Sequence, residues 1–129
     1  MPNTGQFSGS FGQGRGPLLD TLRRAIEHRD ADQVTSLFAD DAELRIISKN
    51  HKPSAPQVLR GKSEIAKYLK DVYGRAMTHE LQDPVVGEDG LSFLEACRYD
   101  DGTRVLGSTT IKLRDGKIAR ETVVEAWDE

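Results

Sequence analysis

Three Asp-Gly pairs punctuate the last third of the chain: Asp89-Gly90, Asp101-Gly102 and Asp115-Gly116. Asp-Gly favours the backbone that tight hairpin turns require, and runs typical of β-strands flank each pair. Each pair is therefore expected to join two antiparallel strands. Together the pairs predict a four-stranded antiparallel meander over residues 77–86, 91–99, 103–113 and 117–127.

Apolar residues at helical spacing precede this meander and predict amphipathic helices. Pro17 is expected to open the first helix, because the N–H that proline lacks has no partner at that position anyway. Asp30 is expected to cap the second helix, with Gln33 three residues later as its capping-box partner. The Asp40-Asp41 pair then marks the end of the second helix.

A short strand, a loop and a third helix complete the region before the meander. Residues 43–48 predict the strand, and residues 49–60, which contain two prolines, predict the loop. Ser63 is expected to cap the third helix, and Gly74 is its expected C-terminal stop. The predicted order is two helices, a strand, a third helix and the meander.

Length and composition bound the class of protein. The chain has 129 residues, enough for one domain, with a Gly/Ser-rich segment over 1–16 expected to be a flexible tail and 17–129 the folded domain. The net charge of -3, with basic residues scattered among acids, excludes a general nucleic-acid role.

The location of the protein is predicted from its cysteine and its apolar runs. Cys97 is the single cysteine, so an internal disulfide is excluded and a reducing compartment fits. No apolar run approaches the length of a membrane span, and no signal peptide is visible. We therefore expect a cytoplasmic protein without membrane partners.

An ordered set of motifs runs along the chain: Leu37 to Ala42, Leu59 to Lys62 with Ile65 and Tyr68, Asp115 to Ile118, and Trp127 with Asp128. This order resembles the nuclear-transport-factor-2-like superfamily and, within it, the SnoaL-like group. The resemblance covers about residues 18–128.

The resemblance implies an α+β fold shaped like a cone. Three N-terminal helices would pack on a curved antiparallel sheet that encloses an apolar pocket. Homodimers through the outer face of the sheet are common in this superfamily. Its members include ketosteroid isomerases, polyketide cyclases, epoxide hydrolases and many non-enzymes, so the fold leaves the function open.

The established catalytic sets of the superfamily are mostly missing when they are carried over residue by residue. The base of ketosteroid isomerase falls on Ile46, its tyrosine donor on Leu22 and its protonated-aspartate donor on Thr109. The aspartate of the cyclases falls on Val123, and the arginine of the epoxide hydrolases falls near Phe93. The resemblance therefore does not imply a ketosteroid isomerase of the known type.

The resemblance also indicates which face of each strand points into the pocket. The inward face carries the carboxylates Glu95, Glu121 and Glu125 and the imidazole of His79. The other residues expected to line the pocket are Leu22, Ile46, Tyr68, Phe93, Cys97, Thr109, Ile111, Val123 and Trp127.

Carboxylates in an apolar pocket suggest proton-transfer chemistry. A buried carboxylate is costly unless its pKa rises or it finds a partner. A His–Glu pair would bring an acid and a base near neutrality, so we hypothesise a catalytic set of Glu95, His79 and Glu121. The alternative stays open that these acids are solvated rim groups or ion-pair partners and that His79 is structural.

No metal or cofactor is expected. A nucleophilic Cys97–His79 pair would need a third group to orient it, and the spacing of His79 and the glutamates matches no metal-ligand motif. The predicted partners are a small apolar molecule and a second copy of the chain. The outer face expected between subunits carries Arg98, Thr110, Lys112, Arg120, Thr122 and Val124.

The sequence leaves two classes of function open. One is a cofactor-independent enzyme that isomerises, cyclises or dehydrates a polyketide- or steroid-like molecule by general acid–base catalysis. The other is a module that binds a ligand or dimerises without turnover.

Overall fold

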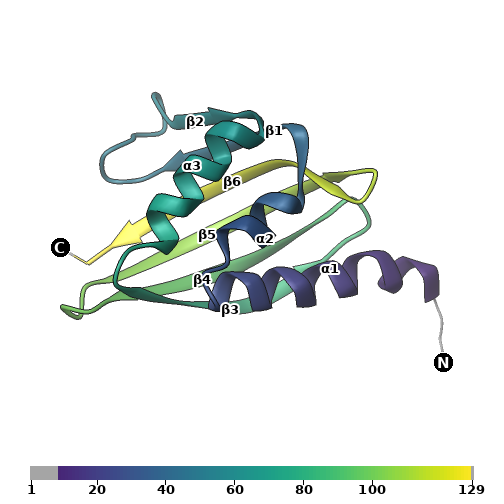
Figure 1. Cartoon of the computed structure of the whole chain (residues 1–129), viewed down its shortest axis with the longest axis horizontal. Helices are drawn as coiled ribbons and strands as arrows, with labels where there is room; N and C mark the ends of the chain where they lie inside the picture. Colours follow the sequence, from purple (N-terminus) through teal and green to yellow (C-terminus); the bar gives the residue numbers. More distant parts are fainter. Residues whose placement is uncertain (1–8, 129) are drawn as a thin grey trace.

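The computed structural model describes residues 9–128, and their side chains from residue 16 onward. It contains two long helices, one short helix and a six-stranded sheet (Figure 1). The helices are α1 (Gly9–Glu27), α2 (Ala31–Ser36) and α3 (Gly61–Tyr73). The strands are β1 (Phe38–Ile47), β2 (Gln57–Arg60), β3 (Met77–Val86), β4 (Gly90–Tyr99), β5 (Arg104–Arg114) and β6 (Lys117–Trp127).

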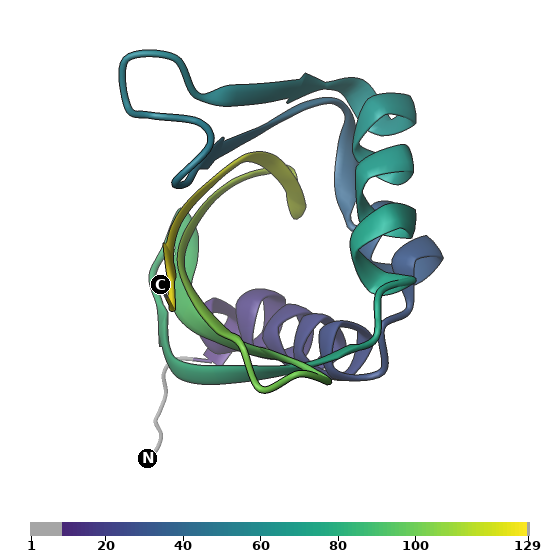
Figure 2. The same cartoon turned by 90° about the vertical axis from the view of Figure 1, so that its left-hand side faces the viewer.

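The sheet curls around the interior of the molecule. Its strand order is β2-β1-β6-β5-β4-β3. In Figure 2 the sheet bends into an open arc, with α1 beside one end of the arc and α3 across its open side. The predicted α+β fold with a curved sheet is therefore confirmed, but the expectation of a purely antiparallel sheet is wrong, because β1 runs parallel to β6.

The meander follows the prediction closely, yet its three Asp-Gly pairs act differently. Asp115 and Gly116 both have positive φ, 53° and 76°, and form the two-residue turn that such a pair favours. Gly102 also has positive φ, in a longer loop. Gly90 instead starts β4, where an added Cβ would lie 2.0 Å from the carbonyl oxygen of Ile111, so close backbone approach requires glycine there.

The start of α1 and the end of α2 differ from the prediction. Helix α1 begins at Gly9, so Pro17 lies inside it and half of the expected tail is helical; residues 1–8 lie outside the described residues. Asp30 caps α2 as predicted and accepts from the backbone N–H of Gln33 at 3.0 Å. Helix α2 ends at Ser36, however, and Asp40-Asp41 belong to β1.

Burial explains why a strand replaces the end of the second helix. Phe38 is 1% exposed and pairs with Ile118 of β6, so this part of the chain gains core burial and sheet hydrogen bonds together. The predicted loop 49–60 also contains a strand, β2, which pairs with β1. The third helix starts two residues before Ser63, although Gly74 ends it as predicted.

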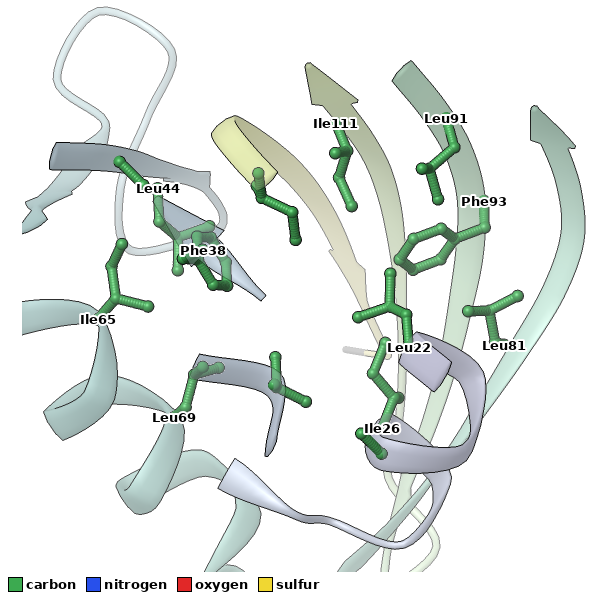
Figure 3. Close-up of a cluster of buried hydrophobic side chains, with 14 of the residues drawn as sticks. Leu22, Ile26, Phe38, Leu44, Ile65, Leu69, Leu81, Leu91, Phe93 and Ile111 are labelled. Carbon is green, nitrogen blue, oxygen red and sulfur yellow. The ribbon is translucent and has the colours of Figure 1, made fainter. Parts of the chain in front are cut away.

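The core occupies the part of the interior beside α1. Figure 3 shows Leu22 and Ile26 of α1 pointing toward Phe93 and Leu81 of the sheet. Phe38, Leu44, Ile65, Leu69, Leu91 and Ile111 complete the labelled cluster. The side chains of α1 therefore fill this end of the arc.

Helix α1 also covers the exposed edge of the sheet. Strand β3 is an edge strand, and Leu81 in its middle accepts a hydrogen bond from Arg23 Nη1 at 2.9 Å through its carbonyl oxygen. The N–H of Leu81 donates to Glu27 Oε2 at 3.0 Å. These side chains satisfy backbone groups that an open edge would leave to water or another chain.

Among the described residues, none of the helices has both the length and the apolar character that a membrane-spanning helix needs.

Candidate functional site

A cavity of about 260 Å³ lies between the concave face of the sheet and α3. This volume is near the lower end for pockets that bind small molecules. Strands β1 and β3 to β6, helix α3 and the segment after β1 all contribute residues to its wall. The cavity is therefore the space in the arc that the core beside α1 leaves unfilled.

The strand register determines which side chains meet on the cavity wall. Glu95 pairs with Gly107, which in turn pairs with Glu125, so these three residues form one row across β4, β5 and β6. The next row on the same, inward face of the sheet contains His79, Cys97, Val105 and Trp127. Chemistry-bearing residues from four strands are thus gathered in two adjacent rows.

Most of the residues expected in the pocket lie on its wall: Ile46, Tyr68, His79, Glu95, Cys97, Glu121, Val123, Glu125 and Trp127. Leu22, Phe93, Thr109 and Ile111 do not, and for them the expectation is wrong. They point toward the interior, but α1 fills that end of the arc, so Leu22, Phe93 and Ile111 pack in the core.

His79, Glu95 and Cys97 form a hydrogen-bonded cluster on the wall. Nδ1 of His79 lies 2.8 Å from Oε2 of Glu95, and the Cys97 sulfur lies 3.3 Å from the same nitrogen. The Cys97 thiol also donates to Glu95 Oε2 at 3.6 Å. The His79 side chain is 1% exposed and that of Glu95 is 21% exposed, so Glu95 reaches the cavity better than His79 does.

The cluster does not suit a thiolate nucleophile. Burial, reinforced by the carboxylate of Glu95, raises the pKa of the Cys97 thiol far above its usual range. A thiol held in this neutral form is a poor nucleophile. Glu95 also bonds to the same ring nitrogen that Cys97 approaches, rather than orienting the imidazole from its other side.

The same cluster has the spacing of a metal site but lacks a supporting contact. The ligand atoms of His79, Glu95 and Cys97 all lie within 4.8 Å of one another. Within the part of the chain that the structure describes, Nε2 of His79 is buried and has no hydrogen-bond partner. Imidazoles that bind metals nearly always donate from the second nitrogen to a carboxylate, carbonyl or water.

Glu121 has a different environment from Glu95. Burial raises the pKa of the Glu121 carboxyl to about 8, and the negative charge of Glu95 adds to this effect. No hydrogen bond or ion pair joins the Glu121 side chain to another residue between 16 and 128. Its side chain is enclosed by protein yet lines the cavity, which accounts for its partial exposure.

Two tyrosines of α3 face the carboxylates across the cavity. Burial raises the pKa of Tyr68 well above its ordinary value, and the charges of Glu125, Glu95 and Glu121 contribute in the same direction. Burial and nearby carboxylates also raise the pKa of Tyr73. The Tyr73 ring packs edge-on against His79, with 5.1 Å between ring centroids. Both phenols therefore stay neutral and keep their O–H as a donor.

Aromatic and basic side chains surround one end of the cavity. Trp127 stacks on Tyr99 with 6.0 Å between centroids, and Lys49 Nζ lies 4.5 Å from the Trp127 ring centroid. Arg75 donates to the Tyr99 hydroxyl at 3.0 Å and to Asp71 at 2.7 Å.

Sequence reasoning missed Met77, at the start of the meander, and several wall residues from outside the meander: Ser48, Asn50, His51, Gln57 and Arg75. Three of these, Asn50, His51 and Gln57, belong to the segment 49–60 predicted as a loop or to the strand inside it. The parity of the meander strands carries no signal for such residues. Only the polar character of the segment after β1 could have indicated them.

Comparison with known proteins places the fold among solved structures. A candidate ketosteroid isomerase from Kribbella flavida has a TM-score of 0.73 at 15% identity, over 94% of this chain and 83% of that chain. An NTF2-like protein of unknown function from Mesorhizobium loti has a TM-score of 0.78 at 12% identity, over 89% and 93%. A candidate polyketide cyclase from Sinorhizobium meliloti has a TM-score of 0.64 at 18% identity, over 83% and 93%.

These identities are low, so the likeness establishes the shared fold alone. The search of curated proteins gave no match. The SnoaL-like domain family matches residues 19–121, most of the chain and nearly all of the elements that build the cavity. The motif order, the curved sheet around a cavity and this match agree, and the chain belongs to the SnoaL-like domain family.

Proposed function

We propose that the protein binds a small, largely apolar molecule in its cavity and catalyses a proton transfer on it. The observation that carries this proposal is Glu121, a carboxyl group on the cavity wall with a pKa of about 8 and no protein partner within the described residues. At neutral pH this group is a carboxylic acid, which can donate its proton to a bound molecule.

Glu95 supplies the complementary base. It reaches the cavity, and His79 and Cys97 both contact its Oε2, which holds the carboxylate in one position. In this scheme Glu95 removes a proton from the bound molecule while Glu121 donates one to a developing oxyanion. Two carboxyl groups with different environments can divide the roles of acid and base in this way.

His79 is a positioning residue in this scheme rather than a group that touches the ligand. Its side chain is almost fully buried and its Nδ1 faces Glu95. It orients the base and can accept the proton that Glu95 removes. The reactions that fit these roles are isomerisation, cyclisation or dehydration of a small polyketide- or steroid-like molecule, without a cofactor.

The machinery of ketosteroid isomerase itself is not available at the corresponding positions. Its base would stand at Ile46, which lines the cavity as an apolar residue. Its two donors would stand at Leu22 and Thr109, both buried outside the cavity wall. The proposed acid and base therefore come from other positions of the same concave face.

A second candidate function is ligand binding without turnover. It is favoured because the members of the His79 cluster make hydrogen bonds to one another. His79, Glu95 and Cys97 bond to one another, which is also how buried polar groups are satisfied for structural reasons. On this reading the acids would only orient a ligand. The two candidates differ in whether the bound molecule is converted.

We also propose that the protein forms a homodimer through the outer face of the sheet. Leu106 of β5 and Val124 of β6 are 42% and 48% exposed on this face, and burying such side chains favours association. Light scattering of the wild type and of a Leu106→Lys, Val124→Lys variant would test it. A wild-type dimer that the variant disrupts is expected, and a wild-type monomer would contradict the proposal.

The proposed function is tested by recovering the bound molecule. Gently purified protein is analysed by native mass spectrometry, denatured, and searched for a released small molecule. The recovered compound is then incubated with fresh protein in deuterated water. Conversion or deuterium incorporation with the wild type, lost in Glu121→Gln and Glu95→Gln, supports catalysis. A compound that is bound but neither converted nor labelled would instead support the binding module.

A further inference from the structure

The cavity wall is rich in acids and poor in permanent positive charge. It carries three carboxyl groups, whereas Arg75 is the single lysine or arginine among the described wall residues. Arg75 is already engaged by Asp71 and by the Tyr99 hydroxyl. Within the described residues, no ion pair joins a lysine or arginine to Glu95, Glu121 or Glu125. A bound molecule is therefore in a position to supply the missing positive charge.

Two of the carboxylates lie on either side of a glycine on the concave face of the sheet. Glu95 and Glu125 lie on either side of Gly107 in one row of the sheet. Neighbouring strands are about 4.8 Å apart, so the two glutamate backbones are roughly 10 Å apart with no side chain between them. A Cβ added at Gly107 would lie 3.2 Å from Cγ1 of Val123, so the Val123 side chain already covers part of this position and a ligand group would lie beside it, between the two carboxylates.

Each of these carboxylates is held by one oxygen and leaves the other available. Oε2 of Glu95 contacts His79 and Cys97, while its Oε1 has no hydrogen bond to any residue that the structure describes. Oε1 of Glu125 accepts from the indole N–H of Trp127 at 3.1 Å, while its Oε2 makes no contact within the described residues. The protein thus fixes both groups and leaves one oxygen of each for a ligand.

The charges of Glu95 and Glu125 both act on groups that line the same cavity. The charges of Glu95 and Glu125 each raise the pKa of the Cys97 thiol and of the Tyr68 hydroxyl on the opposite wall. The ring of Trp127 lies beside Glu125 and already attracts one cation, because Lys49 Nζ lies 4.5 Å from its centroid, whereas no lysine or arginine within the described residues pairs with Glu125.

We propose that the row Glu95–Gly107–Glu125 is a subsite for a protonated amine, so that the ligand is a small apolar molecule carrying an ammonium group. An ammonium has three donors, and the two free carboxylate oxygens would accept two charge-assisted hydrogen bonds from it. Gly107 lines the cavity between them and adds no side chain of its own to the wall. This inference rests on the proposed function, because it specifies a group on the molecule that the cavity binds.

The test compares three probes of one size that differ in charge: cyclohexylmethylamine, cyclohexylmethanol and cyclohexanecarboxylate. Binding at neutral pH is measured by calorimetry and by the fluorescence of Trp127, the single tryptophan of the chain. The amine is expected to bind at least about tenfold more tightly than the alcohol, as two charge-assisted hydrogen bonds predict. The carboxylate is expected to bind most weakly.

Matched variants locate the preference. Glu125→Gln keeps the shape of the side chain and removes its charge, so the amine should lose most of its advantage while the alcohol binds as before. Gly107→Ala adds a methyl group between the two glutamates and should weaken the binding of the amine more than the binding of the alcohol. Glu88→Gln, an exposed residue outside the cavity, should leave all three affinities unchanged.

The outcomes separate this inference from the proposed function. If the alcohol binds as tightly as the amine, or the carboxylate binds best, the amine subsite is refuted while ligand binding in the cavity stands. An amine preference that survives in Glu125→Gln would also refute the subsite. If none of the probes binds, the subsite is refuted, while the proposed function is decided by the recovery of the bound molecule described above.

Discussion

Glu121 and Glu95 are two identical side chains on one cavity wall, and their neighbours give them different properties. Glu95 contacts His79 and Cys97, whereas the Glu121 carboxyl is buried without a partner within the described residues. Burial and the negative charge of Glu95 disfavour the ionised form of Glu121. Divergent environments of this kind are what let one site hold an acid and a base at one pH.

The raised pKa of Glu121 predicts a specific pH dependence of stability. Between its ordinary pKa of 4.5 and its folded pKa of about 8, the folded state holds a proton that the unfolded state has released. Stability therefore falls as the pH rises through this window. Glu121→Gln should remove that fall, gaining about 4 kcal/mol relative to the wild type between pH 5 and pH 9. Urea unfolding at several pH values checks this, and parallel profiles for the two proteins would contradict it.

The cluster around His79 predicts unequal costs for two substitutions. His79→Ala removes a buried ring and leaves Glu95 with only the weak Cys97 thiol donor, so we expect a loss of about 2–4 kcal/mol in unfolding free energy. Glu95→Gln keeps the shape and a hydrogen-bonding oxygen, so a loss of about 1 kcal/mol is expected. Chemical denaturation measures both, with Glu88→Gln as control. Equal losses of several kcal/mol in both variants would mark Glu95 as structural and weaken its proposed role as base.

Strand parity predicted the direction of the site residues but not the extent of the cavity. His79, Glu95 and Glu121 lie on the wall because alternation in a strand is a local property of the backbone. Phe93 and Ile111 share the inward face, yet α1 covers them, and this depends on contacts between segments far apart in the chain. The partners of each glutamate depend on the same long-range packing.

At the scale of elements, the meander was predictable, whereas the start of α1 and the end of α2 were not. Turn chemistry is local, so Asp-Gly pairs place hairpins correctly even where the turn geometry varies. The end of α2 is decided instead by the burial of Phe38 and its pairing with β6. Strand β2 is only four residues long and exists because β1 offers it an edge, which no local pattern reveals.

Gly90 predicts a large cost for a small substitution. A Cβ at this position would lie 2.0 Å from the backbone oxygen of Ile111, so β4 and β5 would have to separate. Gly90→Ala should therefore lose about 3 kcal/mol or more, in line with overpacking against backbone. Gly16→Ala in α1 meets nothing within 4 Å and should be neutral or stabilising. Thermal unfolding of the two variants compares them, and similar melting temperatures would count against the close approach.

The cover that α1 gives to β3 predicts a second effect of element packing. Arg23→Ala and Glu27→Ala each remove a hydrogen bond to the backbone of Leu81, at an expected cost of about 1 kcal/mol each. The exposed edge should also favour association between molecules. Light scattering during mild heating measures this, with the exposed Arg24→Ala on the same helix as control. Aggregation equal to that of the control would mean that these side chains do not protect the edge.

At the scale of the whole molecule, one side of the arc is filled and the other is hollow. Helix α1 and the core residues stabilise the fold at one end, and α3 closes a cavity of about 260 Å³ at the other. The order of the motifs in the sequence predicted the fold, and membership of the SnoaL-like family agrees with that prediction. The sequence could not predict the function, because the acids that define the site take their properties from neighbours on four different strands and α3.

The central claim is that a neutral carboxylic acid lies on the wall of a largely apolar cavity. The most direct measurement is a carbon NMR titration of protein labelled in its glutamate carboxyl groups, with Glu121→Gln used to assign the resonance. We expect the Glu121 carboxyl to titrate with a midpoint near 8. A midpoint near 4.5, the ordinary value for glutamate, would contradict the claim and remove the proposed acid from the site.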